Sequence, residues 1–174
     1  RGKIDWRQLS KNPSPGAIHL LETNPNKIDW RNLSSNPTAI HLLEQNQDKI
    51  CWKGLSLNPS PGAISLLEQN QNKIYWIALS SNPGAISILK KNQDSIIWSL
   101  LAINPEASSL LEENKDIINW DWLSANPGAI SLLKKNLDKI NWVEMSANSS
   151  SEAIRLLEQH PNKINWSWLS RNSN

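Results

Sequence analysis

Apolar and polar positions along this chain follow a pattern that returns every 22 or 24 residues. One tryptophan marks each return, and most of the residues between consecutive tryptophans repeat as well. These column tryptophans are Trp6, Trp30, Trp52, Trp76, Trp98, Trp120, Trp142 and Trp166. A period of this length is typical of a stack of small structural units, each of which contacts its neighbours, rather than of one globular fold.

The second half of each period predicts an α-helix. Asn36-Pro37 offers a capping side chain followed by a proline at the first helical position. Apolar residues then recur at spacings of three and four between residues 39 and 43, which gives one buried face. Asn46 is expected to end the helix in the left-handed conformation. Because such a short helix is not stable alone in water, it must stack on neighbouring repeats.

The longer repeats carry two extra residues just before this helix. Ser14 and Ser60 then replace asparagine as the expected caps, each followed by a proline. In the last insertion, Ser149 and Glu152 fit a capping box. The insertions therefore preserve the helix start and leave the stack intact.

The first half of each period predicts a shorter turn of α- or 3-10 helix around the tryptophan. Plausible caps directly precede the tryptophan in five repeats, as Asp5, Asp29, Asn119, Asn141 and Asn165. Cys51, Tyr75 and Ile97 occupy that position in the middle repeats, and alternative caps lie three residues before it in four repeats, as Asp48, Asp94, Asp116 and Asp138. Both helix starts remain open from the sequence.

These elements together predict an all-α solenoid of seven to eight two-helix repeats, each of 22–24 residues, with a core of tryptophan, isoleucine, leucine and alanine columns. Residues 1–174 are expected to form a single continuous array. The chain has no initiator methionine and its pattern is cut at both ends, so we expect it to be part of a longer array.

Composition narrows the class of protein. The net charge of +2 gives no strong general attraction to polyanions. The single cysteine excludes an internal disulfide framework and favours an intracellular setting. No apolar run approaches the ~20 residues that span a bilayer, so no membrane association is expected. We find no nucleophile–base set, phosphate-binding loop or metal-ligand spacing, and therefore expect no enzyme activity, cofactor, metal or small-molecule substrate.

The repeat motif resembles a known kind of sequence. Residues 120–130 read Trp-Asp-Trp-Leu-Ser-Ala-Asn-Pro-Gly-Ala-Ile, and related runs cover the whole chain. This motif resembles the short tryptophan-containing repeats of giant-virus proteins, which implies a viral origin and a place in the host cytoplasm or the virion. The architecture is also similar to leucine-rich variant repeats, which alternate α- and 3-10 helices. The tryptophan column and the missing cysteine cluster depart from that family, so no cluster cofactor is implied.

Residues outside the repeated columns are the candidates for binding. Trp122 and Trp168 lie two residues after a column tryptophan, at a variable position that we expect to be exposed. Exposed tryptophan is enriched at protein-binding hot spots. In the middle repeats, Tyr75, Ile77 and Leu100 make variable positions apolar and extend the candidate patch.

The sequence therefore favours a non-enzymatic scaffold that binds a protein partner, or itself, along an extended face. The alternative is a nucleic-acid-binding protein that uses a regular line of lysines to follow phosphates. That line comprises Lys3, Lys27, Lys49, Lys73, Lys139 and Lys163. Because a glutamate column recurs in the same repeats, nucleic-acid binding is the less favoured function.

Overall fold

The computed structural model describes residues 3–172 and contains helices and no strand within that range. The prediction of an all-α repeat solenoid is confirmed. Each repeat begins with a short α-helix at the column tryptophan, which we call the Trp-helix. The Trp-helices are α1 (Trp6–Lys11), α3 (Trp30–Leu33), α5 (Trp52–Leu55), α7 (Trp76–Ser80), α9 (Trp98–Leu101), α11 (Trp120–Ser124), α13 (Trp142–Ser146) and α15 (Trp166–Leu169).

A second α-helix follows in each repeat, and a 3-10 turn leads to the next Trp-helix. The second helices are α2 (Pro15–Glu22), α4 (Ile40–Gln45), α6 (Pro61–Gln69), α8 (Ile86–Lys91), α10 (Ser108–Glu112), α12 (Ile130–Lys134) and α14 (Ser151–Glu158). The connecting 3-10 turns are η1 (Pro25–Lys27), η2 (Gln47–Lys49), η3 (Gln71–Lys73), η5 (Gln93–Ser95), η6 (Lys115–Ile117), η8 (Leu137–Lys139) and η9 (Pro161–Lys163). Two further 3-10 turns, η4 (Pro83–Ala85) and η7 (Pro127–Ala129), lead directly into α8 and α12.

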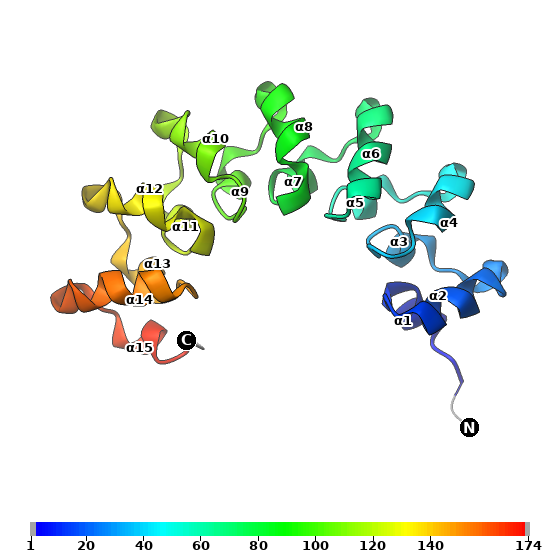
Figure 1. Cartoon of the computed structure of the whole chain (residues 1–174), viewed down its shortest axis with the longest axis horizontal. Coiled ribbons are helices and arrows are strands. Elements are labelled where there is room, and N and C mark those ends of the chain that lie inside the picture. The colour runs from blue at the N-terminus through cyan, green and yellow to red at the C-terminus, as the bar shows by residue number, and fades with distance from the viewer. Residues whose placement is uncertain (1–2, 173–174) are drawn as a thin grey trace. The chain divides into compact units, whose positions relative to one another are not determined.

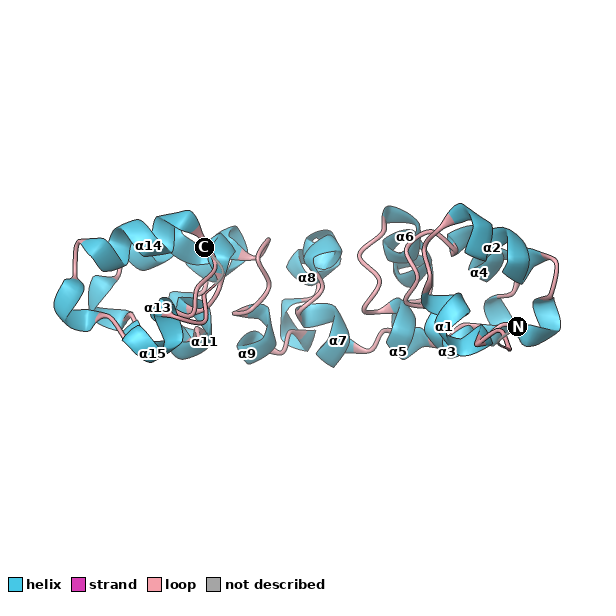
Figure 2. Cartoon of the chain, turned by 90° about the horizontal axis from the view of Figure 1, so that it is seen from below, coloured by secondary structure: helices cyan, strands magenta, loops and turns pink. Residues whose placement is uncertain are grey.

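The chain forms two compact units that meet between Lys91 and Asn92. Within each unit, the Trp-helices form one row and the second helices form another (Figure 1). Seen from below, the two rows lie in separate layers, with α1, α3 and α5 in one layer and α2, α4 and α6 in the other (Figure 2). Each unit is therefore a two-layered stack of repeats.

The structure resolves where the Trp-helices begin. Each begins at the tryptophan, and the upstream aspartates belong to the separate 3-10 turns, as Asp48 does in η2. The expected cap side chains accept backbone N–H groups, for example Asp29 from Asn32 at 2.9 Å. Cys51 precedes its helix without a side-chain cap. Of the two kinds of helix that the sequence left open around the tryptophan, the structure has the α-helix, and 3-10 turns lie upstream of it.

The second helices begin as the prolines indicate in the longer repeats, with one correction in the last of them. In the short repeats the expected start at Asn36-Pro37 is wrong, because α4 begins only at Ile40 and the Asn36 side chain accepts the Thr38 N–H within a turn that precedes the helix. The hydroxyls of Ser14 and Ser60 accept the N–H groups of Ala17 and Ala63, as predicted. In the last repeat the cap is Ser150, which accepts from Ala153 at 3.1 Å, and not Ser149. Asn148 fixes this start, because its side-chain oxygen accepts the Ser150 N–H, as the Asn58 oxygen accepts that of Ser60.

The expectation that Asn46 ends its helix in a left-handed conformation is wrong. Its φ is −135°, and no described residue has a positive φ. The Asn46 side chain instead donates to the Leu42 carbonyl at 2.9 Å, which pairs an acceptor left open by the helix end. The same bond recurs from Asn24, Asn70, Asn114 and Asn136.

Leucine, isoleucine and alanine columns form the core, but the tryptophan column does not lie inside it. Leu33, Ala39 and Leu43 have no exposed surface, and the equivalent residues of the other repeats are also buried, except Leu9 and Leu169 in the terminal Trp-helices, which are half-buried. The column tryptophans are half-buried, and Trp166 is 68% exposed. Their regular spacing reflects a fixed place at the edge of the stack, where Lys49 lies 4.9 Å over the Trp30 ring and Lys73 lies 4.7 Å over the Trp52 ring.

Buried serines link each Trp-helix to the next repeat. Ser34 donates to the Trp30 carbonyl at 2.7 Å and accepts the Cys51 N–H at 2.9 Å. Equivalent pairs of bonds are formed by Ser10, Ser56, Ser124 and Ser146. We call this column the serine ladder. It pairs the first N–H of the following repeat, which would otherwise be buried without an acceptor.

Buried asparagines form a parallel column, the asparagine ladder. The Asn58 amide donates to the carbonyls of Ser34 and Asn36 at 3.2 and 3.1 Å, and its oxygen accepts the Ser60 N–H at 3.0 Å. Asn36, Asn82, Asn126 and Asn148 form the same three bonds. Each asparagine therefore satisfies loop backbone in two successive repeats.

Candidate protein-binding surface

We use the name Trp-helix face for the residues two and five positions after each column tryptophan. Within each unit these residues follow one another along the row of Trp-helices. Gly54 shows how close its helices lie, because a Cβ at Gly54 would be 3.0 Å from the Arg31 carbonyl oxygen. A side chain at this position must therefore be small and buried, or large and directed outward.

This packing corrects the expectation that the second position after the tryptophan is exposed in every repeat. Asn32, Gly54 and Ala78 are buried there, whereas Trp122 and Trp168 are 42% and 44% exposed. The variable side chains at this position therefore reflect how tightly neighbouring Trp-helices approach. The two tryptophans protrude because their rings are too large for that space.

In the second unit, the Trp-helix face contains an apolar hollow of about 270 Å³. It is lined by Leu100, Ile103, Trp122, Ala125 and Glu144, which come from three successive Trp-helices. The structure thus brings together two of the five candidate residues, Trp122 and Leu100. Glu144 is the one charged side chain among the lining residues. This combination can receive an apolar side chain while an acidic group lies at the rim.

Trp168 lies in a separate, smaller hollow on the same face. Ala147, Arg171 and Asn172 complete its lining. The Arg171 guanidinium lies 5.5 Å from the centre of the Trp168 ring, which is within the range of a cation–π contact.

Tyr75 and Ile77 belong to the first unit. Both are exposed, and Lys53 places its ammonium group 5.1 Å from the centre of the Tyr75 ring. Ile77 lies one position after Trp76, beside rather than on the Trp-helix face. Neither residue lines the hollow that holds Trp122.

The first unit carries a different hollow on its Trp-helix face, which we call the basic hollow. It has a volume of about 220 Å³ and is lined by Lys11, Arg31, Asn32, Lys53, Gly54 and Leu57, together with Ser35 and Cys51. Three of these residues are cationic and none is acidic. The sequence analysis did not identify this site; its signal was a glycine at a position where other repeats carry larger side chains.

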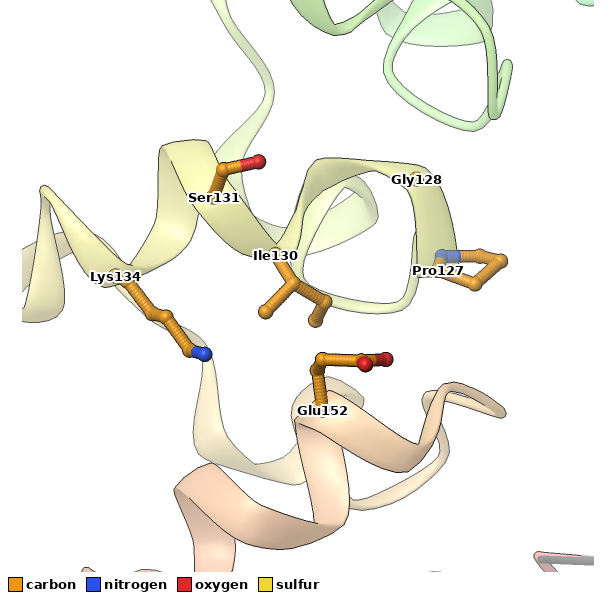
Figure 3. Close-up of a pocket in the computed structure, with 6 residues that line it drawn as sticks. All are labelled: Pro127, Gly128, Ile130, Ser131, Lys134 and Glu152. Carbon is orange, nitrogen blue, oxygen red and sulfur yellow. The ribbon is translucent and has the colours of Figure 1, made fainter.

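A third kind of hollow lies among the second helices, away from the Trp-helix face. It has a volume of about 310 Å³ and is lined by residues of η7, α12 and α14, among them Ser131, Lys134 and Glu152 (Figure 3). Glu152 accepts from the Ser151 hydroxyl at 3.1 Å. Its own backbone N–H and that hydroxyl hold the pKa of Glu152 below its usual value. Ser131 points away from Lys134 and Glu152, so the three do not form a nucleophile–base arrangement (Figure 3).

The histidine and glutamate columns form contacts between repeats. His41 Nε2 lies 2.8 Å from a Glu22 oxygen, and Lys135 donates to Glu112 at 2.6 Å. No cluster of three or more metal-binding side chains occurs among residues 3–172. No helix in that part of the chain is long and apolar enough to cross a membrane.

Comparisons of this chain with known proteins found no match. Protein-family models, curated proteins and solved structures all gave no match.

Proposed function

We propose that this chain is a non-enzymatic helical-repeat scaffold that binds a protein partner, or a second copy of itself, along the Trp-helix face. The observation that carries the proposal is the apolar hollow around Trp122. A large, half-exposed tryptophan beside Leu100 and Ile103 is the kind of residue that dominates protein interfaces. On the resemblance alone, we also propose a viral origin and a place in the host cytoplasm or virion.

The alternative, nucleic-acid binding through the lysine line, has less support. Lys49 and Lys73 lie over the rings of Trp30 and Trp52, the column tryptophans of their own repeats. These contacts give the lysines a structural role within the stack. A salt titration separates the two functions, because phosphate contacts weaken steeply with ionic strength and apolar contacts do not.

The test compares two tryptophans that lie two positions apart. Trp122→Gln should weaken partner binding or self-association by about 2 kcal/mol and leave the melting temperature nearly unchanged. Trp120→Gln should instead destabilise the fold by about 2 kcal/mol, because a half-buried ring is lost. Self-association is measured by sedimentation, partner binding by recovery from the native source, and stability by circular dichroism. If the two variants melt alike, Trp122 has a structural role and the proposed surface is wrong.

A further inference from the structure

We propose that the basic hollow of the first unit is a binding site for a carboxylate side chain of an acidic protein segment. The inference deepens the proposed function, on which it rests for the class of partner. It assigns a chemical preference to a part of the Trp-helix face that the apolar hollow does not include.

The cations of the hollow have no carboxylate partner. Lys11, Arg31 and Lys53 are exposed, and no carboxylate pairs with any of them in residues 3–172. Lys53 also lies over the Tyr75 ring, which leaves its charge without a counter-ion. Lys91, by contrast, pairs with Glu68 at 3.6 Å. Three unpaired cations around one concave surface create a positive potential that attracts an anion.

The hollow also holds a buried hydrogen-bond donor with no acceptor. Asn32 is 9% exposed, and its side-chain Nδ2 is the one buried side-chain polar atom without a hydrogen-bond partner in the described chain. Buried donors are normally paired, because losing water without gaining a partner is unfavourable. Because this Nδ2 has almost no accessible surface, a ligand oxygen in the hollow would supply the missing acceptor once the Asn32 amide turns toward it.

Gly54 lines the hollow at the position that Trp122 fills in the second unit. Its lack of a side chain allows a close approach to the preceding Trp-helix, since a Cβ would lie 3.0 Å from the Arg31 carbonyl oxygen, and no ring covers the hollow. Leu57, half-exposed at the rim, adds an apolar contact. A ligand that combines an anionic oxygen with neighbouring apolar atoms matches this lining.

A carboxylate fits better than a phosphate group. Phosphate sites usually use several backbone N–H groups at helix starts. Here Asp5 already accepts the N–H groups of Arg7 and Gln8, and Asp29 accepts that of Asn32. The start of α5 has no side-chain cap, but that helix is a single turn of four residues. The other donors around the hollow are side chains, which suits a single carboxylate.

The balance of charge favours the same ligand. Residues 1–91 carry 11 lysines and arginines against 6 aspartates and glutamates, whereas residues 92–174 carry 7 against 10. The first unit therefore has a net charge of +5 and the second of −3, which together give the +2 of the chain. An acidic segment is attracted to the unit that contains the hollow.

The test is a titration of the whole chain with a short capped peptide rich in glutamate and carrying one leucine. Its glutamine counterpart and inorganic phosphate are titrated in parallel. Binding is followed by calorimetry and by the NMR signals of the Asn32 side-chain amide. We expect the glutamate peptide to bind and to shift those signals, and the other two probes to bind at least about tenfold more weakly.

Two variants with a matched control locate the site. Arg31→Glu should weaken peptide binding by more than about tenfold, since attraction becomes repulsion. Lys90→Glu makes the same change in charge on a second helix of the same unit, and should have little effect. An equal loss in both would show that net charge alone attracts the peptide, and would overturn the site.

Asn32→Leu distinguishes a role of Asn32 in binding from a purely structural role. Leu100 already occupies the equivalent position, so the change is compatible with the fold. Because it removes a buried unpaired donor, it should raise the melting temperature while weakening peptide binding. A lower melting temperature would show that the amide is already paired, and would overturn the proposal, as would tighter binding of phosphate than of the peptide.

The peptide titration and the association test of the proposed function can fail independently of each other. Trp122→Gln lies in the other unit and should leave peptide affinity unchanged. If the peptide fails to bind while Trp122→Gln still abolishes partner binding, the carboxylate site is wrong and the scaffold function stands. If peptide binding holds and Trp122→Gln changes no association, the scaffold proposal fails alone.

Discussion

The serine after each buried leucine connects local helix geometry to the stacking of repeats. Its hydroxyl donates within its own Trp-helix and accepts from the first residue of the next repeat, as Ser124 does with Trp120 and Asn141. At Ala102 the column has no hydroxyl, so the N–H of Asn119 cannot be paired in this way. The fifth repeat therefore has a defect that a single oxygen atom would correct.

Ala102→Ser should stabilise the protein by about 1 kcal/mol, because it offers the N–H of half-buried Asn119 an acceptor at a position where neighbouring repeats accommodate serine. The reverse change, Ser124→Ala, should cost about 1–3 kcal/mol by leaving the Asn141 N–H unpaired. Both are measured as free energies of unfolding in urea. A loss of stability in the Ala102 variant would show that this repeat lacks the space its neighbours have.

At the scale of the element, the 3-10 turns η4 and η7, which lead into second helices, contact the loop of the preceding repeat through a glycine. A Cβ on Gly128 would lie 1.9 Å from the Pro105 carbonyl oxygen, and one on Gly84 would lie 2.3 Å from that of Pro59. Gly16 has nothing within 4 Å of the same point. All described glycines have negative φ, so the requirement at Gly128 is one of space and not of backbone conformation.

Gly128→Ala should therefore destabilise the protein by about 2 kcal/mol or more, because a backbone carbonyl cannot move aside without shifting the repeat. Gly16→Ala should be neutral or stabilise by up to about 1 kcal/mol, since alanine restricts the unfolded chain and favours helix. Thermal melts of the two variants provide the comparison. Equal effects would mean that α12 can shift away from the preceding repeat at little cost.

At the scale of the whole molecule, stability rests on a narrow apolar core and two polar ladders, with ion pairs at the surface. Glu112 and Lys135 form such a pair between successive repeats. The hydrogen bond from Lys135, together with its charge, holds the pKa of Glu112 below its usual value. The contribution of this pair is present above the ordinary glutamate pKa and is lost as the pH falls through the lowered one.

Melting temperature should therefore fall as the pH is lowered from about 5 to about 3. Glu112→Gln should make that fall slightly shallower and have little effect at neutral pH, because exposed pairs contribute little. Melts recorded across this pH range for both proteins test this. An unchanged slope in the variant would show that other carboxylates account for the acid sensitivity.

The repeat length, the helix starts of the longer repeats and most caps could be predicted from the sequence, because each depends on local chemistry such as that of Ser60-Pro61 or Asp29. The depth of the tryptophan column could not. A regular column occurs both in a core and at a stack edge, and the contact that distinguishes them at Trp30 comes from Lys49, in the turn that follows the second helix.

The candidate site was predicted in part. The exposure of Trp122 and Trp168 followed from their irregular place in the pattern, and that of Tyr75 and Ile77 was also expected. The basic hollow was not predicted. It depends on how closely Gly54 lets one Trp-helix approach the preceding one, and one repeat read alone does not show what its neighbour places against it.

In both ladders, the hydrogen bonds that link one Trp-helix to the next have the same direction. The donor follows the acceptor in the chain, as Asn58 donates to the carbonyls of Ser34 and Asn36, and the Cys51 N–H donates to the Ser34 hydroxyl oxygen. During synthesis the earlier repeat leaves the ribosome first and already presents every oxygen that the next repeat requires. Each repeat therefore acts as a template for its successor, and the chain can assemble in the order in which it is translated.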